Sequence, residues 1–158
     1  MTPPPRTFYL INKLNSAINA QMESLLREFD LTVPQYVYLS QIRGHGSLSS
    51  SHLSRINRVS AQSISEMMRI LEKRHLVGKK MSQENKRSFL ISLTENGESV
   101  LSICDSLIDT LEPTIFAGIN SSEHAAFRDV LERMIANARG REHRRALTNH
   151  GEVTTQAT

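Results

Sequence analysis

The stretch that decides the fold is SAQSISEMMRILEKRHLVGKKMSQENKRSFLISLTENG, residues 60–97. Its first part repeats apolar residues at intervals of three and four, the spacing of one helix face. Ser60 suits the N-cap, because a serine hydroxyl accepts from a free amide of the first turn. We therefore predict a helix over about residues 61–75. Its predicted buried residues are Ile64, Met67, Met68 and Leu71.

After His75 the spacing changes from helical to alternating. Residues 77–81 suit a short strand, and residues 89–93 alternate as a second strand requires. The segment between them, residues 82–87, is polar and charged. The pattern predicts a β-hairpin with a charged tip directly after the helix.

A shorter helix is predicted upstream, over about residues 33–43. Thr32 and Pro34 are typical of a helix start. Gly44 and Gly46 are typical of a helix end.

The serine-rich stretch 47–51 suits either a flexible linker or a loop that leads into a helix. We favour the second, because Leu53 and Ile56 follow at helical spacing and Asn57 suits a tight turn. The order is then short helix, turn, polar-faced helix and hairpin. This order predicts a winged helix-turn-helix, mainly α with a small β-hairpin wing (α+β).

Long helices flank this lobe, which we place at residues 31–111. The first covers residues 8–30, and the lobe ends in a connecting helix over 94–111, capped by Thr94 and kinked or ended by Pro113. The apolar face expected of the connecting helix is Val100, Ile103, Leu107 and Leu111. The apolar stripe of the first helix is Phe8, Ile11, Leu14, Ile18, Met22, Leu25 and Phe29.

A last helix opens at Ser121, within a segment placed at residues 112–139. Its predicted apolar side is Phe127, Val130, Leu131, Met134 and Ala138. Stripes this long exceed what one small domain covers, so we expect residues 8–30 and 112–139 to be dimerisation helices. Residues 1–7 and 140–158 are expected to be a flexible arm and a flexible tail.

Composition narrows the class of protein. The 158 residues suit one domain, and the single cysteine, Cys104, favours a reducing compartment. The chain start lacks the features of a secretory signal, and no apolar run is long enough to span a bilayer. We expect a cytoplasmic protein that has no membrane partner. Cys104 adjoins an apolar stripe, which favours a buried, inert thiol over a redox sensor.

The net charge of +3 hides a local concentration of basic residues. Between positions 55 and 87, nine lysines and arginines face three glutamates, which favours contact with phosphate. An ordinary solvated surface is the alternative for any one of these residues. Gln62 suits an adenine edge in the major groove, and Arg87 suits a narrow minor groove. The full predicted DNA-binding set is Ser49, Ser51, Arg55, Arg58, Ser60, Gln62, Ser63, Ser65, Arg69, Lys73, Lys86 and Arg87.

Three segments resemble the MarR family of transcriptional regulators: LTVPQYVYL (31–39), LEKRHLV (71–77) and LISLTENG (90–97). The resemblance covers about residues 8–138. It implies a homodimeric repressor that binds double-stranded DNA at a palindromic operator, and in many members a small effector molecule. One departure concerns the wing tip: the two aspartates usual in the family are replaced, although Arg87 remains.

The effector hypothesis is a small aromatic carboxylate, because cations and aromatic side chains lie on the helices that would border its pocket. The candidate effector-binding residues are Tyr9, Lys13, Tyr36, Tyr38, Arg43 and His45. Core tyrosines and solvated basic residues are the alternative interpretation.

Catalysis, metals and cofactors have little support in the sequence. The six histidines lack the close spacing of a metal site, and no nucleophile elbow or phosphate loop is present. We therefore expect neither an enzyme nor a metal or cofactor site. Two other functions stay open: a DNA-binding regulator without an effector, and a winged-helix protein-interaction module.

Overall fold

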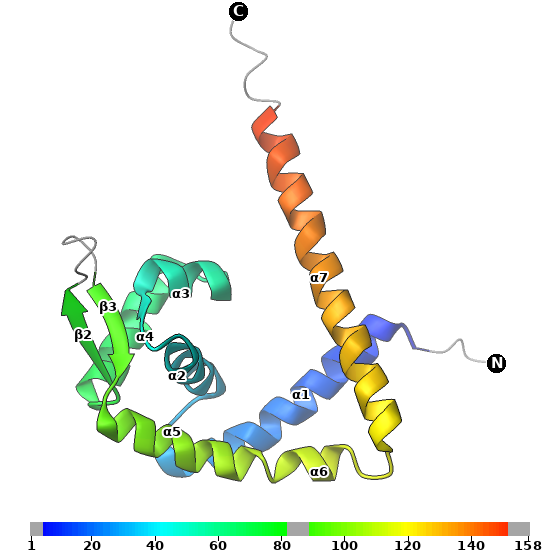
Figure 1. Cartoon of the computed structure of the whole chain (residues 1–158), viewed down its shortest axis with the longest axis horizontal. Helices are drawn as coiled ribbons and strands as arrows, with labels where there is room; N and C mark the ends of the chain where they lie inside the picture. The colour runs from blue at the N-terminus through cyan, green and yellow to red at the C-terminus, as the bar shows by residue number, and fades with distance from the viewer. Residues whose placement is uncertain (1–4, 82–88, 152–158) are drawn as a thin grey trace, which may run out of the picture. The chain divides into compact units, whose positions relative to one another are not determined.

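A computed structural model describes residues 5–81 and 89–151 (Figure 1). Clustering of contacts divides the chain into two compact units, residues 1–112 and 113–158. The elements of the first unit are α1 (Thr7–Leu26), the 3₁₀ turn η1 (Arg27–Phe29), α2 (Val33–His45), β1 (Leu48–Ser49), α3 (Ser50–Asn57), α4 (Ala61–Lys73), β2 (Val77–Met81), β3 (Phe89–Leu93) and α5 (Glu95–Ile108). Helix α6 (Leu111–Ile115) spans the division, and α7 (Ser121–Gly151) belongs to the second unit.

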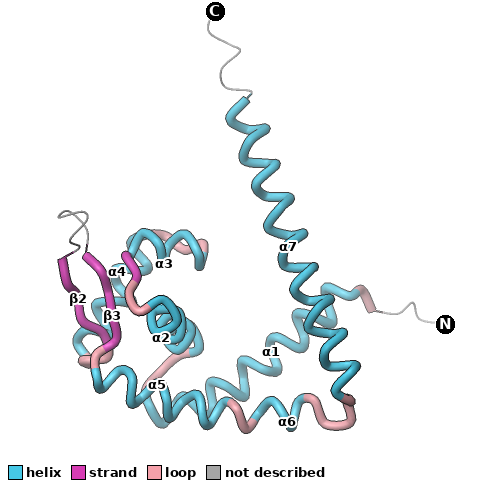
Figure 2. Tube along the Cα trace, viewed as in Figure 1, coloured by secondary structure: helices cyan, strands magenta, loops and turns pink. Residues whose placement is uncertain are grey.

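The first unit is a helical lobe with a small antiparallel sheet of order β1-β3-β2 at one side (Figure 2). Strands β2 and β3 pair from Val77↔Leu93 to Met81↔Phe89. The core joins the helices to this sheet, and its fully buried side chains include Leu39, Ile42, Leu53, Ile64, Met68, Leu71, Ile91 and Leu101. The predicted fold class, a mainly α winged helix-turn-helix, is confirmed.

The predicted helix starts are confirmed by their caps. The hydroxyls of Thr32, Ser60 and Thr94 each accept a hydrogen bond from the backbone amide three residues later. Thr32 also forms a capping box, because its own amide donates to the Gln35 side chain at 2.9 Å.

Three turns of the first unit rest on non-glycine residues in the left-handed region: Asp30, Arg58 and His75. Each lies at the end of a helix or 3₁₀ turn. The residue that follows it donates its backbone amide to the carbonyl five positions before that residue. This is the Schellman arrangement, which ends a helix sharply. Asn57 indicated a tight turn beside Arg58, but the turns at Asp30 and His75 had no signal in the sequence, because glycine is the usual residue at such positions.

Strand β1 was missed. Leu48 and Ser49 pair with Ile91 and Leu90, so part of the serine-rich stretch forms the third strand of the sheet. Two residues are too few to show alternation, which is why the sequence predicts only a loop there.

The predicted apolar face of α5 is wrong at Ile103, which is 51% exposed. The buried residues of α5 are Gly97, Leu101 and Cys104. A β-carbon at Gly97 would lie 1.9 Å from the Leu76 carbonyl oxygen, so this helix approaches the backbone at a glycine. The buried face of α5 begins at Gly97, and a glycine does not count as apolar when a helix face is chosen by the spacing of apolar residues. The sequence pattern therefore pointed to the wrong face. The predicted burial of Cys104 is confirmed.

Two predicted boundaries are also wrong. Helix α5 ends at Ile108, before the expected residue 111, and the Thr110 hydroxyl donates to the Leu107 carbonyl there. Pro113 lies in the first turn of α6, where proline is tolerated. Helix α7 begins as predicted at Ser121 but continues to Gly151, through the stretch expected to be a flexible tail. Half of residues 140–151 favour helix: three arginines and one each of alanine, glutamate and leucine.

Candidate nucleic-acid interface

The turn between α3 and α4 is fixed by side chains as well as by backbone. Asn57 and Gln41 of α2 exchange two amide hydrogen bonds, of 2.7 and 3.1 Å. The Ser54 hydroxyl donates to the Val59 carbonyl at 2.6 Å. Arg58 supplies the left-handed residue. The end of α3 is therefore joined to α2 by side chains, and one hydrogen bond spans the turn toward α4.

Helix α4 has one fully buried face and one exposed polar face. Ile64, Met68 and Leu71 have no exposed surface and anchor the helix to the core. The exposed side carries amide, hydroxyl and cationic groups, the groups that bind base edges and phosphates. Its predicted DNA-binding residues, all exposed, are Ser60, Gln62, Ser63, Ser65, Arg69 and Lys73.

Part of this polar face is occupied by contacts within the protein. The Ser60 hydroxyl accepts from the Ser63 amide at 3.0 Å and lies 2.8 Å from the Ser63 hydroxyl. Ser60 therefore has a structural role as the N-cap. Gln62, Ser65 and Arg69 project from the same helix and are exposed.

The other predicted DNA-binding residues of the lobe lie in α3 or at its two ends. Ser49 is its N-cap, accepting from the His52 amide at 3.2 Å, and its hydroxyl lies 3.0 Å from that of Ser51. Arg55 is exposed, with its guanidinium 3.5 Å from the His52 ring. Arg58 is exposed at the turn.

Among the basic residues counted in the sequence, Arg74 and Lys79 join α4 to other elements. The Arg74 guanidinium donates to the carbonyls of Phe29 and Asp30, which joins the end of α4 to the end of η1. The Lys79 ammonium pairs with Glu72 at 2.7 Å, which joins β2 to α4. Charge counting along the sequence cannot separate such residues from those available to phosphate.

The wing is the hairpin of β2 and β3. Its predicted contact residues, Lys86 and Arg87, lie outside the described residues. Lys80, near the distal end of β2, is exposed.

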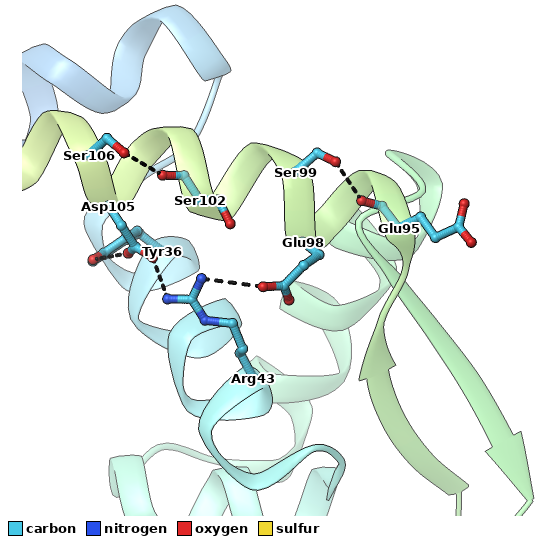
Figure 3. A network of polar contacts seen from close by, with 8 residues as sticks. All are labelled: Tyr36, Arg43, Glu95, Glu98, Ser99, Ser102, Asp105 and Ser106. Carbon is cyan, nitrogen blue, oxygen red and sulfur yellow. Dashed lines mark hydrogen bonds and ion pairs between the residues drawn. The ribbon is translucent and has the colours of Figure 1, made fainter.

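Tyr36 and Arg43 meet at one carboxylate, that of Asp105 (Figure 3). The Tyr36 hydroxyl donates to Asp105 at 2.8 Å, and the Arg43 guanidinium donates to the other oxygen of that carboxylate. Arg43 also lies 3.5 Å from Glu98. Burial, followed by the contact with Asp105, raises the pKa of Tyr36 to about 12, and the hydrogen bond to Asp105 raises the pKa of Arg43. These contacts join α2 to α5, and no pattern in the sequence indicated a role for Asp105.

The other four candidate effector residues do not join this cluster. Tyr9 and Lys13 form an exposed pair on α1, with the ammonium 5.8 Å from the ring centroid. Tyr38 is buried in the core. The His45 ring is 2.9 Å from the Gln41 carbonyl oxygen, at the end of α2. The structure therefore brings two of the six predicted residues together.

Residues 5–81 and 89–138 contain no group of three or more potential metal ligands. Within the same ranges, no helix combines the length and the apolar character that crossing a bilayer requires.

The fold and the polar-faced α4 define a winged helix-turn-helix protein. Residues 31–89 match the MarR family model. Over this segment the chain resembles the MarR family, whose members are DNA-binding transcriptional regulators rather than enzymes.

One curated relative and two solved structures are similar to this chain over most of its length. An HTH-type transcriptional repressor of Mycobacterium tuberculosis is 23% identical over 126 residues, which cover 80% of this chain and 91% of the relative. Wild-type MarR from E. coli in its apo form superposes with a TM-score of 0.73 at 20% identity, covering 84% of this chain and 98% of that one. The MepR–DNA complex of S. aureus superposes with a TM-score of 0.74 at 20% identity, covering 84% and 96%.

Proposed function

We propose that this protein is a homodimeric transcriptional repressor that reads operator DNA with helix α4. The observation that carries the proposal is the polar outer face of α4, held on a fully buried apolar face. A helix with this construction fits the major groove, where each base pair presents a distinct edge. The repressor relative from M. tuberculosis and the MepR–DNA complex support the same function.

Each α4 residue has a proposed role. Gln62 lies near the N-terminus of the helix and contacts an adenine edge, while Ser63 and Ser65 contact bases or phosphates. Arg69 and Lys73 lie further along and bind the backbone. Ser49, Ser51, Arg55 and Arg58, from the region of α3, add phosphate contacts. Lys86 and Arg87 of the wing enter the minor groove.

Dimerisation is proposed from apolar side chains that each unit leaves exposed. On α1 the exposed fraction is 73% for Phe8 and 42% for Leu14, and on α7 it is 42% for Val130. Such residues call for a second surface, and a second copy with two-fold symmetry supplies it. The operator is then palindromic, with one α4 in each half-site.

A binding assay with labelled DNA tests the proposal. The duplex is the region upstream of the protein's own gene, at low salt, and the competitor is a duplex of scrambled sequence. We expect Gln62→Ala to reduce the preference for the operator about tenfold, with little change in affinity for the scrambled duplex. Arg27→Ala, an exposed arginine of η1, is the matched control. Absence of binding by the wild-type protein at low salt would leave the protein-interaction module as the function.

A second proposal concerns a small aromatic acid as effector. Tyr36 and Arg43 together hold the carboxylate of Asp105, which supports their ability to hold the carboxylate of a ligand. Such a ligand competes with Asp105. In thermal-shift measurements, benzoic and phenolic acids then stabilise the protein, and Asp105→Asn strengthens that response. No shift with either protein would favour a regulator without an effector. The proposed location is the cytoplasm, where such a regulator meets DNA.

A further inference from the structure

The distal end of the wing exposes two large apolar side chains. Met81 is 58% exposed and Phe89 is 55% exposed, and they are paired directly across β2 and β3. Directly paired residues of an antiparallel ladder project from the same face of the sheet. The two side chains therefore form one apolar surface at the end of the described hairpin.

The register shows which face this is. Side chains alternate along a strand, so Lys79↔Ile91 lies on the same face as Met81↔Phe89. Ile91 is fully buried, and Lys79 pairs with Glu72 of α4 at 2.7 Å. The Met81–Phe89 surface therefore continues the core face of the sheet, on the side of the wing that is turned toward α4.

We propose that the Met81–Phe89 surface contacts deoxyribose of the DNA strand that separates the two grooves. This inference rests on the proposed function, in which α4 occupies the major groove and the wing reaches the minor groove. One sugar–phosphate strand then runs between α4 and the wing, along the face that carries these residues. Phe and Met are residue types that proteins use in apolar contacts at the minor groove.

The charges around the surface fit this occupant. Arg69 and Lys73 are exposed on α4, three residues before and one residue after Glu72, which pairs with Lys79 of this face of the wing. An apolar surface with cationic residues nearby is complementary to a DNA strand, whose phosphates are anionic and whose sugars present C–H groups. A second copy of the chain, with its own cationic lobe, offers no such match.

Hydroxyl-radical footprinting tests the proposal, because the radical cleaves DNA at exposed deoxyribose. The probe is a duplex selected from random sequence by the wild-type protein. The double variant Met81→Gln with Phe89→Thr replaces both side chains by polar ones at exposed positions. We expect the wild-type protein to protect sugars at the boundary between the grooves and the variant to lose that protection.

Affinity and its salt dependence give the second measurement. The double variant should bind the duplex about fivefold more weakly, the scale expected for losing an apolar contact of this size. Its salt dependence should stay unchanged, because no phosphate contact is lost. Leu90→Thr is the matched control, since Leu90 lies on the other face of the same strand.

Each alternative outcome overturns the inference in its own way. Wild-type affinity and protection in the variant would refute the sugar contact and leave the proposed function intact. A change in sedimentation without a change in DNA affinity would assign the surface to a second copy of the chain. Failure of the wild-type protein to bind any duplex would refute both proposals together.

Discussion

Helices α4 and α7 carry similar patterns of apolar residues but bury them to very different extents. In α4, Ile64, Met68 and Leu71 are fully buried by the winged lobe. In α7, Phe127, Val130 and Ile135 are each more than a third exposed. The lobe completes its own core, whereas α7 presents an apolar surface that its own unit does not cover. Helix α4, which we propose reads the DNA, is thus anchored by a core, and α7, which we propose takes part in dimerisation, leaves apolar side chains for another surface to cover.

The largest expected effect is at the close contact within the lobe. In Gly97→Ala, the new β-carbon would lie 1.9 Å from the Leu76 carbonyl oxygen, so α5 must move away from the sheet. We expect a loss of about 4 kcal/mol or more in the free energy of unfolding, measured by urea denaturation. Gly44→Ala in α2 is the matched control, because nothing lies within 4 Å of its β-carbon. Equal stability of the two variants would contradict the packing described for α5.

Core truncation sharpens the comparison of α4 with α7. Met68→Ala should lower the free energy of unfolding by about 3 kcal/mol at every protein concentration. Phe127→Ala should instead weaken the dimer, so its effect on stability should depend on protein concentration. Denaturation at two concentrations, with sedimentation to follow assembly, separates the two cases. A concentration-independent loss for Phe127→Ala would place that side chain in a core of its own unit.

The contacts between α2 and α5 predict a pH effect of intermediate size. The pKa of Tyr36 is raised to about 12, so its neutral form favours the folded state. The associated stability is present below the ordinary tyrosine pKa of about 10 and is lost as the pH rises toward 12. Tyr36→Phe should remove this loss in urea denaturation at alkaline pH.

Asp105→Asn tests the carboxylate in the same cluster. It should lower the pKa of Tyr36, followed by tyrosinate absorbance, and cost about 1 kcal/mol of stability at neutral pH. Ser106→Ala is the matched control, since the Ser106 hydroxyl donates to the Ser102 carbonyl within α5. An unchanged Tyr36 titration in Asp105→Asn would contradict the assigned cause.

The last prediction concerns the reactivity of the Cys104 thiol and involves no change in stability. Its side chain is fully buried, and burial raises the pKa of the thiol. Both properties slow its reaction with a disulfide reagent. We expect slow labelling of the folded protein and fast labelling in denaturant. Fast labelling of the folded protein would reopen the redox interpretation.

The parts of the fold that the sequence predicts are those with local causes. Thr32, Ser60 and Thr94 act within one helical turn, so their capping roles can be read from the sequence. The buried face of α4 is equally local. The burial of Ile103 was wrongly predicted because burial along α5 depends on the contact of Gly97 with Leu76, which is distant in sequence.

The candidate site divides in the same way. The polar face of α4 follows from helical spacing alone. The meeting of Tyr36, Arg43 and Asp105 joins residues more than sixty positions apart, and no local pattern marks it. The structural roles of Arg74 and Lys79 also depend on tertiary contacts.

The most direct test of the central claim is the salt dependence of DNA binding through α4. Arg69→Gln combined with Lys73→Gln removes two exposed cations from the proposed interface, and Arg27→Gln is the control. The logarithm of the association constant decreases linearly with the logarithm of salt concentration. We predict that this decrease is less steep in the double variant, by about two in the magnitude of the slope. The control should keep the wild-type slope. A double variant with the wild-type slope would contradict the assignment of α4 as the DNA-reading helix.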